Sequence, residues 1–307
     1  MLLRLSNVTK RYGSVLALDD VSYEIGEGIT GLLGSNGAGK TTSLKLFIGL
    51  LDPDSGTVEV LGSDTRGSPE FRSRIGYAPE HDCLPRGVPA AEFLAYMAEV
   101  SGLPRTAARL RASDLLRHVG LFEERYRPMG TYSTGMKQRV KLAQALVHDP
   151  AVAFLDEPTA GLDPVGRREM LELVGKVGRE FGISIVISTH LMGDVERVCD
   201  GVVVLDSGRV LRTGAVSTFT RETDTLVVEV VDGASELARA LEARGLSPRV
   251  AGRVLTLEDA GPEDLDALRD ALVESQALLY RLAPARLALS AVFSPVVEAD
   301  EVERAAS

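Results

Sequence analysis

The chain has 307 residues, of which 45% are hydrophobic and 25% are charged, and its net charge is −10. This length allows about two domains, and the composition is that of an ordinary soluble globular protein. No apolar run approaches the roughly 18 residues of a membrane-spanning helix, so we expect that the chain does not cross a membrane. The acidic excess lies mostly after residue 217 and no basic stretch stands out, so nucleic acid is not expected as a partner.

The cysteines and the start of the chain indicate a compartment. Cys83 and Cys199 are far apart in the sequence, and the first residues, MLLRLSNVTKRYG, lack the apolar core of a signal peptide. A disulfide framework is therefore not expected, and the sequence favours a reducing cytoplasm.

The first 217 residues alternate between strand-like and helix-like stretches, which is typical of an α/β fold. Several of the strand-like stretches are nearly continuous apolar runs, which suit strands buried on both faces. The predicted strands cover residues 2–10, a run that ends at 34, 57–62, 74–79, 151–158, 184–189 and 201–208.

Apolar residues recur at helical spacing between about residues 88 and 128, for example Phe93, Tyr96 and Met97. We expect a helical insert in the α/β core here. Its apolar faces either pack within the domain or form a surface for a partner, and the spacing alone leaves both possibilities open.

After about Thr218 the pattern starts again. Residues 225–231, 235–245, 253–258, 263–275 and 277–283 predict a strand, a helix, a strand, a helix and a strand. We therefore expect a small α+β domain over residues 218–297. The small and polar residues 298–307 are expected to form a disordered tail.

A phosphate-binding loop follows the second predicted strand and opens a helix. It fits the pattern G-x-x-x-x-G-K-[ST], in which successive backbone amides turn inward around phosphates. The Lys40 ammonium is expected at the terminal phosphates, and the Thr41 hydroxyl is a Mg²⁺ ligand in such loops. The phosphate-binding residues are Gly34, Ser35, Asn36, Gly37, Ala38, Gly39, Lys40, Thr41 and Thr42.

Two carboxylates end the apolar run AVAFLDEP. Alone, Asp156 and Glu157 would be an acidic loop after a core strand, but a triphosphate site needs a carboxylate of this kind for its metal. We assign Asp156 to Mg²⁺ and Glu157 to the attacking water, as a general base. Pro158 disfavours helical backbone at Glu157, which keeps that carboxylate at the strand end.

A second anion site is predicted almost a hundred residues later, in Tyr132 to Arg139, YSTGMKQR. Ser133 is a good helix cap, and Gly135 leaves the backbone amides of the first turn open. The question is what this site binds, since the phosphate loop already accounts for one nucleotide.

The order of these motifs resembles the nucleotide-binding subunit of ABC transporters, from about Leu2 to Thr218. That resemblance implies an ATPase with ATP and Mg²⁺ as cofactors. YSTGM occupies the place of the family's LSGGQ signature, so Ser133 and Gly135 are expected to bind the γ-phosphate of an ATP held by a second copy of the chain. The resemblance thereby implies a head-to-tail dimer.

Other positions match the family one by one. Tyr12 stands where an aromatic ring stacks on adenine, although a tyrosine after a strand often only packs. His190 matches the histidine that contacts the γ-phosphate and, with Lys40 and Glu157, completes the expected catalytic set. Asp163 matches the loop that communicates between the two sites, and before Pro164 it is also expected to cap a helix.

The sequence departs from the family in two places. The signature has Tyr132, Thr134 and Met136 where Leu, Gly and Gln are usual. Glu80 stands where the family has a glutamine that touches Mg²⁺ or its water and senses the membrane subunit. We retain Glu80 as a candidate metal ligand, since a carboxylate can coordinate the ion but adds charge beside three phosphates.

Glu80, YSTGMKQR and the small C-terminal domain together resemble the drug- and antibiotic-export branch of the superfamily. This implies a cytoplasmic protein, peripheral on the inner face of the membrane, that drives export through a separately encoded membrane subunit. The alternative is a soluble ABC-type ATPase that acts on ribosomes or DNA. A P-loop kinase or GTPase would leave His190 and the signature segment unexplained.

Overall fold

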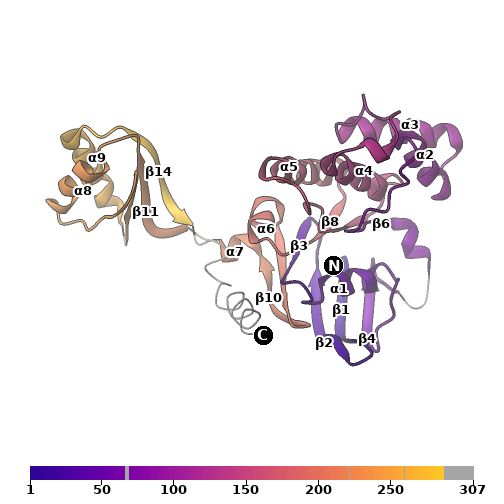
Figure 1. Cartoon of the computed structure of the whole chain (residues 1–307). Helices are drawn as coiled ribbons and strands as arrows, with labels where there is room; N and C mark the ends of the chain where they lie inside the picture. Colours follow the sequence, from indigo (N-terminus) through magenta and orange to yellow (C-terminus); the bar gives the residue numbers. More distant parts are fainter. Residues whose placement is uncertain (66–68, 221, 259, 287–307) are drawn as a thin grey trace. The chain divides into compact units, whose positions relative to one another are not determined.

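The computed structural model describes residues 1–65, 69–220, 222–258 and 260–286. The chain divides into two compact units, Met1–Val216 and Ser217–Ser307, and Figure 1 labels the elements of each. The tail predicted over 298–307 lies outside the described residues. In the part of the chain that the structure describes, no helix is both long and apolar enough to cross a membrane.

The first unit is built on a six-stranded sheet in the order β10-β9-β3-β8-β7-β6. Strands β9, β3, β8, β7 and β6 are parallel, and β10 is antiparallel to β9. Every residue of β3, β7 and β8 is buried, as their continuous apolar sequences predict. The strands are β3 (Ile29–Leu33), β6 (Ile75–Ala78), β7 (Val152–Asp156), β8 (Ser184–Thr189), β9 (Gly201–Asp206) and β10 (Arg209–Ala215).

A second sheet, antiparallel and in the order β2-β1-β4-β5, was not foreseen as a separate layer. It contains β1 (Leu3–Tyr12), β2 (Val15–Ile25), β4 (Ser55–Val60) and β5 (Ser63–Asp64). Burial alternates along β1 and β2, which fits a sheet with one face in the core. The strand predictions did not indicate which strands pair, so the sequence pattern did not separate the two sheets.

Helix α1 (Lys40–Phe47) packs against strands of both sheets. The Phe47 ring stacks on Phe154 of β7, with centroids 6.0 Å apart, and meets Tyr23 of β2 edge-on at the same distance. All three rings belong to one buried cluster that includes residues of both sheets. The phosphate loop at the start of α1 is thereby held between two rigid layers.

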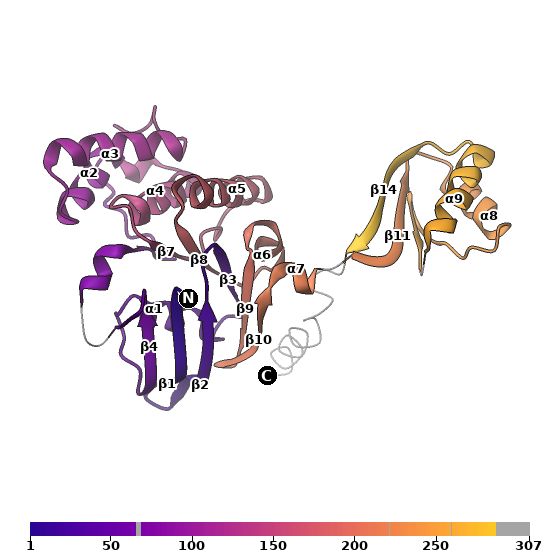
Figure 2. The same ribbon diagram turned by 180° about the vertical axis from the view of Figure 1, so that it is seen from behind.

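The other face of the parallel sheet carries α4 (Thr134–Leu146), α5 (Pro164–Phe181) and α6 (Met192–Val198). Figure 1 and Figure 2 show α4 and α5 on the side of this sheet opposite to β1, β2 and β4. The residues expected to form the helical insert contain α2 (Ala90–Val100) and α3 (Arg105–His118). Short elements complete the unit: η1 (Pro69–Arg74), η2 (Met129–Thr131) and α7 (Val216–Phe219), which runs into the second unit.

The second unit is an antiparallel sheet in the order β12-β13-β11-β14. Two helices cover one of its faces, as Figure 2 shows, and Val228, Leu237, Leu255 and Leu268 belong to the core between them. The elements alternate as β11 (Glu222–Val230), α8 (Ala234–Glu242), β12 (Arg249–Ala251), β13 (Val254–Leu257), α9 (Pro262–Ser275) and β14 (Leu279–Arg286). This is the α+β fold predicted for the C-terminal part, with the short strand β12 added.

Gly76 sets how closely α4 approaches β6. A Cβ at this position would overlap with the backbone carbonyl of Ala145, so only glycine allows the observed contact. We expect Gly76→Ala to lower the melting temperature by several degrees, because overpacking costs about 1–3 kcal/mol. Gly26→Ala is the control, since nothing lies within 4 Å of its added Cβ. Equal melting temperatures of the two variants in thermal circular dichroism would contradict the packing argument.

Candidate functional site

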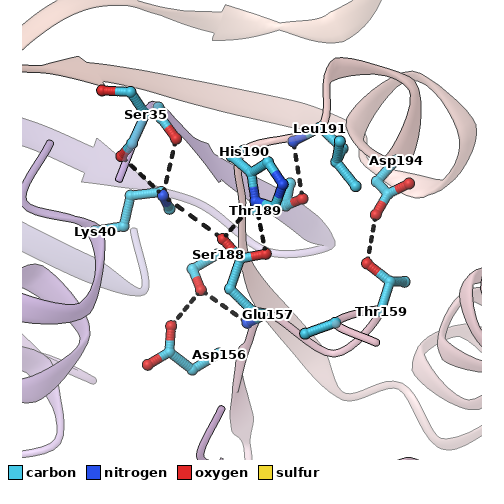
Figure 3. A network of polar contacts seen from close by, with 12 residues as sticks. Ser35, Lys40, Asp156, Glu157, Thr159, Ser188, Thr189, His190, Leu191 and Asp194 are labelled. Carbon is cyan, nitrogen blue, oxygen red and sulfur yellow. Dashed lines mark hydrogen bonds and ion pairs between the residues drawn. The ribbon is translucent and has the colours of Figure 1, made fainter. Parts of the chain in front are cut away.

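The predicted nucleotide-binding groups meet at one edge of the parallel sheet. Leu33 of β3 lies opposite Thr189 of β8, and Asp156 of β7 lies opposite Ser188 of β8. The phosphate loop, the acidic pair and His190 all follow these three strand ends, and Figure 3 shows their side chains together. Parallel pairing therefore brings together residues that are more than 150 positions apart in the sequence.

The phosphate loop has the backbone that its glycines predict. Gly37 and Gly39 have φ angles of 88° and 102°, a region that side chains rarely allow, and Gly39 is the N-cap of α1. The Lys40 ammonium is 6% exposed and donates to the carbonyls of Gly34 at 2.8 Å and Ser35 at 3.0 Å. These two bonds hold the ammonium against the phosphate loop, and its contact with the terminal phosphates stays a prediction.

The candidate Mg²⁺ ligands are in contact. The Thr41 hydroxyl donates to Asp156 Oδ1 at 3.2 Å, and Ser188 Oγ donates to the same oxygen. A hydroxyl and a carboxylate are oxygen donors of the kind that Mg²⁺ prefers, and the ion usually completes its shell with water and phosphate oxygens. Thr41 and Asp156 therefore fit the expected ion.

Glu80 is placed differently from these two residues. It lies on the exposed loop after β6, and its carboxylate makes no hydrogen bond or ion pair within the described ranges. Its proposed contact with Mg²⁺ stays a prediction.

Glu157 lies between two other candidate catalytic groups. Its Oε1 is 3.6 Å from the Lys40 ammonium, and its Oε2 is 3.1 Å from Nδ1 of His190. The side chain of Glu157 is 9% exposed and that of His190 is 47% exposed. The predicted catalytic set of Lys40, Glu157 and His190 is thus assembled in a single chain, with its carboxylate shielded from water.

The backbone at Glu157 is in the left-handed region, with φ 46°. Its N–H donates to the carbonyl of Ser188 at 3.2 Å and to the Ser188 hydroxyl at 3.0 Å. A non-glycine residue keeps such a conformation only where its surroundings hold it. Ser188 therefore holds the backbone of Glu157 as well as the carboxylate of Asp156.

The two predicted helix caps, Ser133 in the second anion site and Asp163 before Pro164, are confirmed. Ser133 Oγ accepts from the Met136 N–H at 3.3 Å at the start of α4, and Asp163 Oδ1 accepts from the Gly166 N–H at 3.1 Å at the start of α5. Both residues line one hollow of about 520 Å³, together with Thr134, Gly135 and Leu162. No residue of the phosphate loop lines this hollow, so within one chain it is separate from the nucleotide edge.

Tyr12 ends β1 with its side chain exposed. The Asp54 carboxylate accepts from the preceding backbone N–H, that of Arg11, at 2.6 Å and from the Lys10 ammonium at 3.0 Å. These bonds fix the end of the strand beside the exposed Tyr12 ring. Stacking of this ring on adenine stays a prediction.

The family model described as "ABC transporter" matches residues 18–160. The Nod factor export ATP-binding protein I of Ralstonia nicotianae is 34% identical, covering 93% of this chain and 91% of that protein. The bacitracin transport ATP-binding protein of Bacillus licheniformis is 36% identical over 68% of each chain. The chain belongs to the ATP-binding subunits of ABC transporters. It binds and hydrolyses ATP.

The solved structures agree with this assignment. A dimeric ATP-binding cassette in a post-hydrolysis state, bound to ADP and Pi, matches with a TM-score of 0.64 and 26% identity, covering 70% of this chain and 99% of that one. The resemblance to the family inferred from the motifs is confirmed, and so is the ABC-type α/β fold.

Several polar residues around the site of this ATP-binding subunit were missed by the sequence patterns. Tyr77 of β6 lies beside Asp156. Burial raises the pKa of the Tyr77 phenol, and the negative charge of Asp156 raises this pKa further, so the phenol stays protonated at neutral pH. Gln138 of α4 donates to the Ala160 carbonyl at 3.2 Å, in the loop that follows Glu157. These contacts depend on which strands and helices are neighbours, and no local motif encodes them.

Lys141 of α4 connects the signature helix to the loop of Glu80. Its ammonium donates to the carbonyls of Pro79 at 2.7 Å and Glu80 at 2.8 Å, and the residue is only 4% exposed. Burial lowers the pKa of Lys141, while the nearby Cys83 and Asp82 oppose this shift. One turn earlier, Lys137 pairs with Asp82 at 2.7 Å. The Glu80 loop is therefore attached to α4 by two cations.

We expect Lys141→Met to release this loop without unfolding the subunit. A hydrogen bond from a charged donor contributes about 1.5–3 kcal/mol, so amide hydrogen exchange in residues 79–84 should accelerate by about tenfold or more. The global melting temperature should fall only modestly, because the loop can open locally and expose the released carbonyls of Pro79 and Glu80 to water. Lys176→Met on α5, whose side chain is 58% exposed, is the control. Unchanged exchange in residues 79–84, measured by mass spectrometry, would show that Lys141 does not hold the loop.

Proposed function

We propose that this ATP-binding subunit powers export of a small molecule through a separately encoded membrane subunit, with Glu157 as the catalytic base. The observation that carries the catalytic assignment is the position of the Glu157 carboxylate, shielded from water and within 3.6 Å of Lys40 and 3.1 Å of His190. A carboxylate that its neighbours hold in place beside the phosphate loop is positioned to take a proton from a water molecule as phosphate charge develops nearby.

The hydrolysis step follows from this arrangement. Glu157 accepts a proton from the attacking water, the water oxygen bonds to the γ-phosphorus, and the bond to the β-phosphate oxygen breaks to give ADP and phosphate. Lys40 and the amides of residues 34–42 hold the phosphates, and His190 donates to the γ-phosphate. Thr41 and Asp156 would hold Mg²⁺, which when bound neutralises phosphate charge. Glu80 is proposed as an additional ligand of that ion or its water.

The active form is a head-to-tail dimer, in which Ser133 and Gly135 of one copy bind the γ-phosphate held by the other. Two observations support this. The hollow lined by Ser133, Gly135 and Asp163 contains no phosphate-loop residue of its own chain, and a related cassette bound to ADP and Pi is dimeric. Helix N-termini bind anions through open amides and the helix dipole. Tyr12 is assigned to the adenine ring.

Export is supported by relatives whose names describe Nod factor export and bacitracin transport. Since no spanning helix occurs in the described part of this chain, the path for the exported molecule must belong to a membrane partner. The subunit would then act from the cytoplasm, bound to the inner face of the membrane. We propose that the ATP-binding domain covers residues 1–217, with its helical insert at about 88–128. The small C-terminal domain is proposed to cover residues 218–297.

Glu157→Gln should reduce ATP hydrolysis by about a hundredfold or more, since loss of a general base typically costs about 10²- to 10⁴-fold. ATP binding should remain, because Lys40 and the phosphate loop are untouched, and the variant should accumulate as a dimer with Mg-ATP. The test combines a phosphate-release assay with light scattering. Glu172→Gln, an exposed residue of α5, removes the same charge as a control. A variant that stays monomeric in saturating Mg-ATP would contradict the shared-site proposal.

The membrane partner is tested by purifying the tagged full chain from its native cells in mild detergent and identifying the proteins that accompany it. We expect a polytopic membrane protein at a fixed ratio, because the ATPase must transmit force to a translocation path. The Glu157→Gln variant with ATP should retain it. Ribosomal proteins or nucleic acid in place of a membrane protein would favour the soluble ABC-type ATPase.

A further inference from the structure

A buried polar contact connects the turn after Glu157 to α6. The Thr159 hydroxyl donates to Asp194 Oδ2 at 2.7 Å, and the two residues are 1% and 4% exposed. They are 35 positions apart in the sequence and come from segments that each carry a proposed catalytic residue. Figure 3 shows the pair beside Glu157 and His190, on the side away from Lys40.

The turn that contains Thr159 needs support from outside. Glu157 has a left-handed backbone, and the turn closes with the Ala160 N–H donating to the Glu157 carbonyl at 3.0 Å. In addition to the bonds with Ser188, the Gln138 side chain donates to the Ala160 carbonyl, and the Asp194 carboxylate accepts from the Thr159 hydroxyl. The turn is thus attached to β8, α4 and α6, and Thr159 provides the attachment to α6.

The segments 157–159 and 190–194 are connected twice. One connection is the contact of Glu157 with His190, whose side chain is 47% exposed. In the proposed reaction Glu157 acts on water and His190 on phosphate, so we do not expect their contact with each other to stay fixed through the cycle. The other connection is the Thr159–Asp194 hydrogen bond, which is closed to solvent and involves no proposed nucleotide ligand.

A buried carboxylate is costly unless it is hydrogen-bonded, and an apolar pair of similar volume would be at least as stabilising. Stability alone therefore does not account for a threonine and an aspartate here. A short, directional bond does fix distance and orientation between two segments in a way that apolar contact does not.

We propose that Thr159 and Asp194 are positioning residues. Their hydrogen bond keeps the segments that carry Glu157 and His190 aligned while the contact between Glu157 and His190 opens and closes. The proposal rests on the proposed catalytic roles of Glu157 and His190. Neither Thr159 nor Asp194 touches the nucleotide; they act through the two residues that do. Small misplacements of a reacting group cost large factors in rate, which is why a remote hydrogen bond can affect catalysis.

The first test compares Thr159→Val, which keeps the shape and removes the hydroxyl, with Thr159→Ser, which keeps the hydroxyl. We expect Thr159→Val to lower kcat by about tenfold or more and to leave KM for ATP nearly unchanged, because the phosphate loop is intact. Thr159→Ser should restore most of kcat. A wild-type kcat in Thr159→Val, measured well below its melting temperature, would overturn the proposal.

The second test separates positioning from stability. In the double variant Thr159→Val with Asp194→Leu, the polar pair is replaced by an apolar one, so the melting temperature should recover relative to either single variant. The value of kcat should stay as low as in the single variants, because the two residues act as one unit. Recovery of kcat together with the melting temperature would show a purely structural role. If Thr159→Val does not fold, this double variant carries the test alone.

Glu157→Gln distinguishes failure of this inference from failure of the proposed function. Substantial hydrolysis by Glu157→Gln would remove the catalytic assignment and, with it, the basis for positioning. An inactive Glu157→Gln beside a fully active Thr159→Val would overturn the positioning role only.

Discussion

The parallel pairing of β3, β8 and β7 is the constraint on which the site depends. Its register sets Leu33 opposite Thr189 and Asp156 opposite Ser188, so three loops leave the sheet at the same level. A slip of one residue would turn Asp156 away from Thr41 and would remove Ser188 from the Asp156 carboxylate and from the Glu157 backbone N–H. The strands are buried on both faces, and this burial enforces the register because a shifted strand would bring polar groups into the core.

Much of the site was predictable because it is written in short continuous motifs. The phosphate loop, Asp156 with Glu157, and the caps Ser133 and Asp163 each depend on a few neighbouring residues. The polar partners that hold them were not predictable, because Ser188, Asp194 and Lys141 act across 30 to 60 positions through strand order and helix placement. The second sheet was missed for a similar reason, since strand pairing depends on distant sequence. The roles assigned to the site residues remain predictions.

The site keeps several charged groups out of water. Lys40, Asp156 and Glu157 are all less than 9% exposed, and each has partners that orient it. Burying charges in this way is costly, and the cost is offset only where every group is bonded. The arrangement suits catalysis because protein groups, rather than mobile water, orient these side chains.

The signature helix α4 connects the loops that matter on either side of the site. Lys141 and Lys137 attach it to the segment 79–82, Gln138 attaches it to Ala160, and its own N-terminus carries Ser133. A helix of 13 residues moves as a rigid rod over such short distances. The loop at Glu80 therefore cannot shift without either breaking these bonds or carrying Ser133 with it. Helix α4 is thus bonded to the loop at Glu80 and to the turn after the proposed catalytic carboxylate, and its N-terminus lies on the surface proposed to meet the second copy.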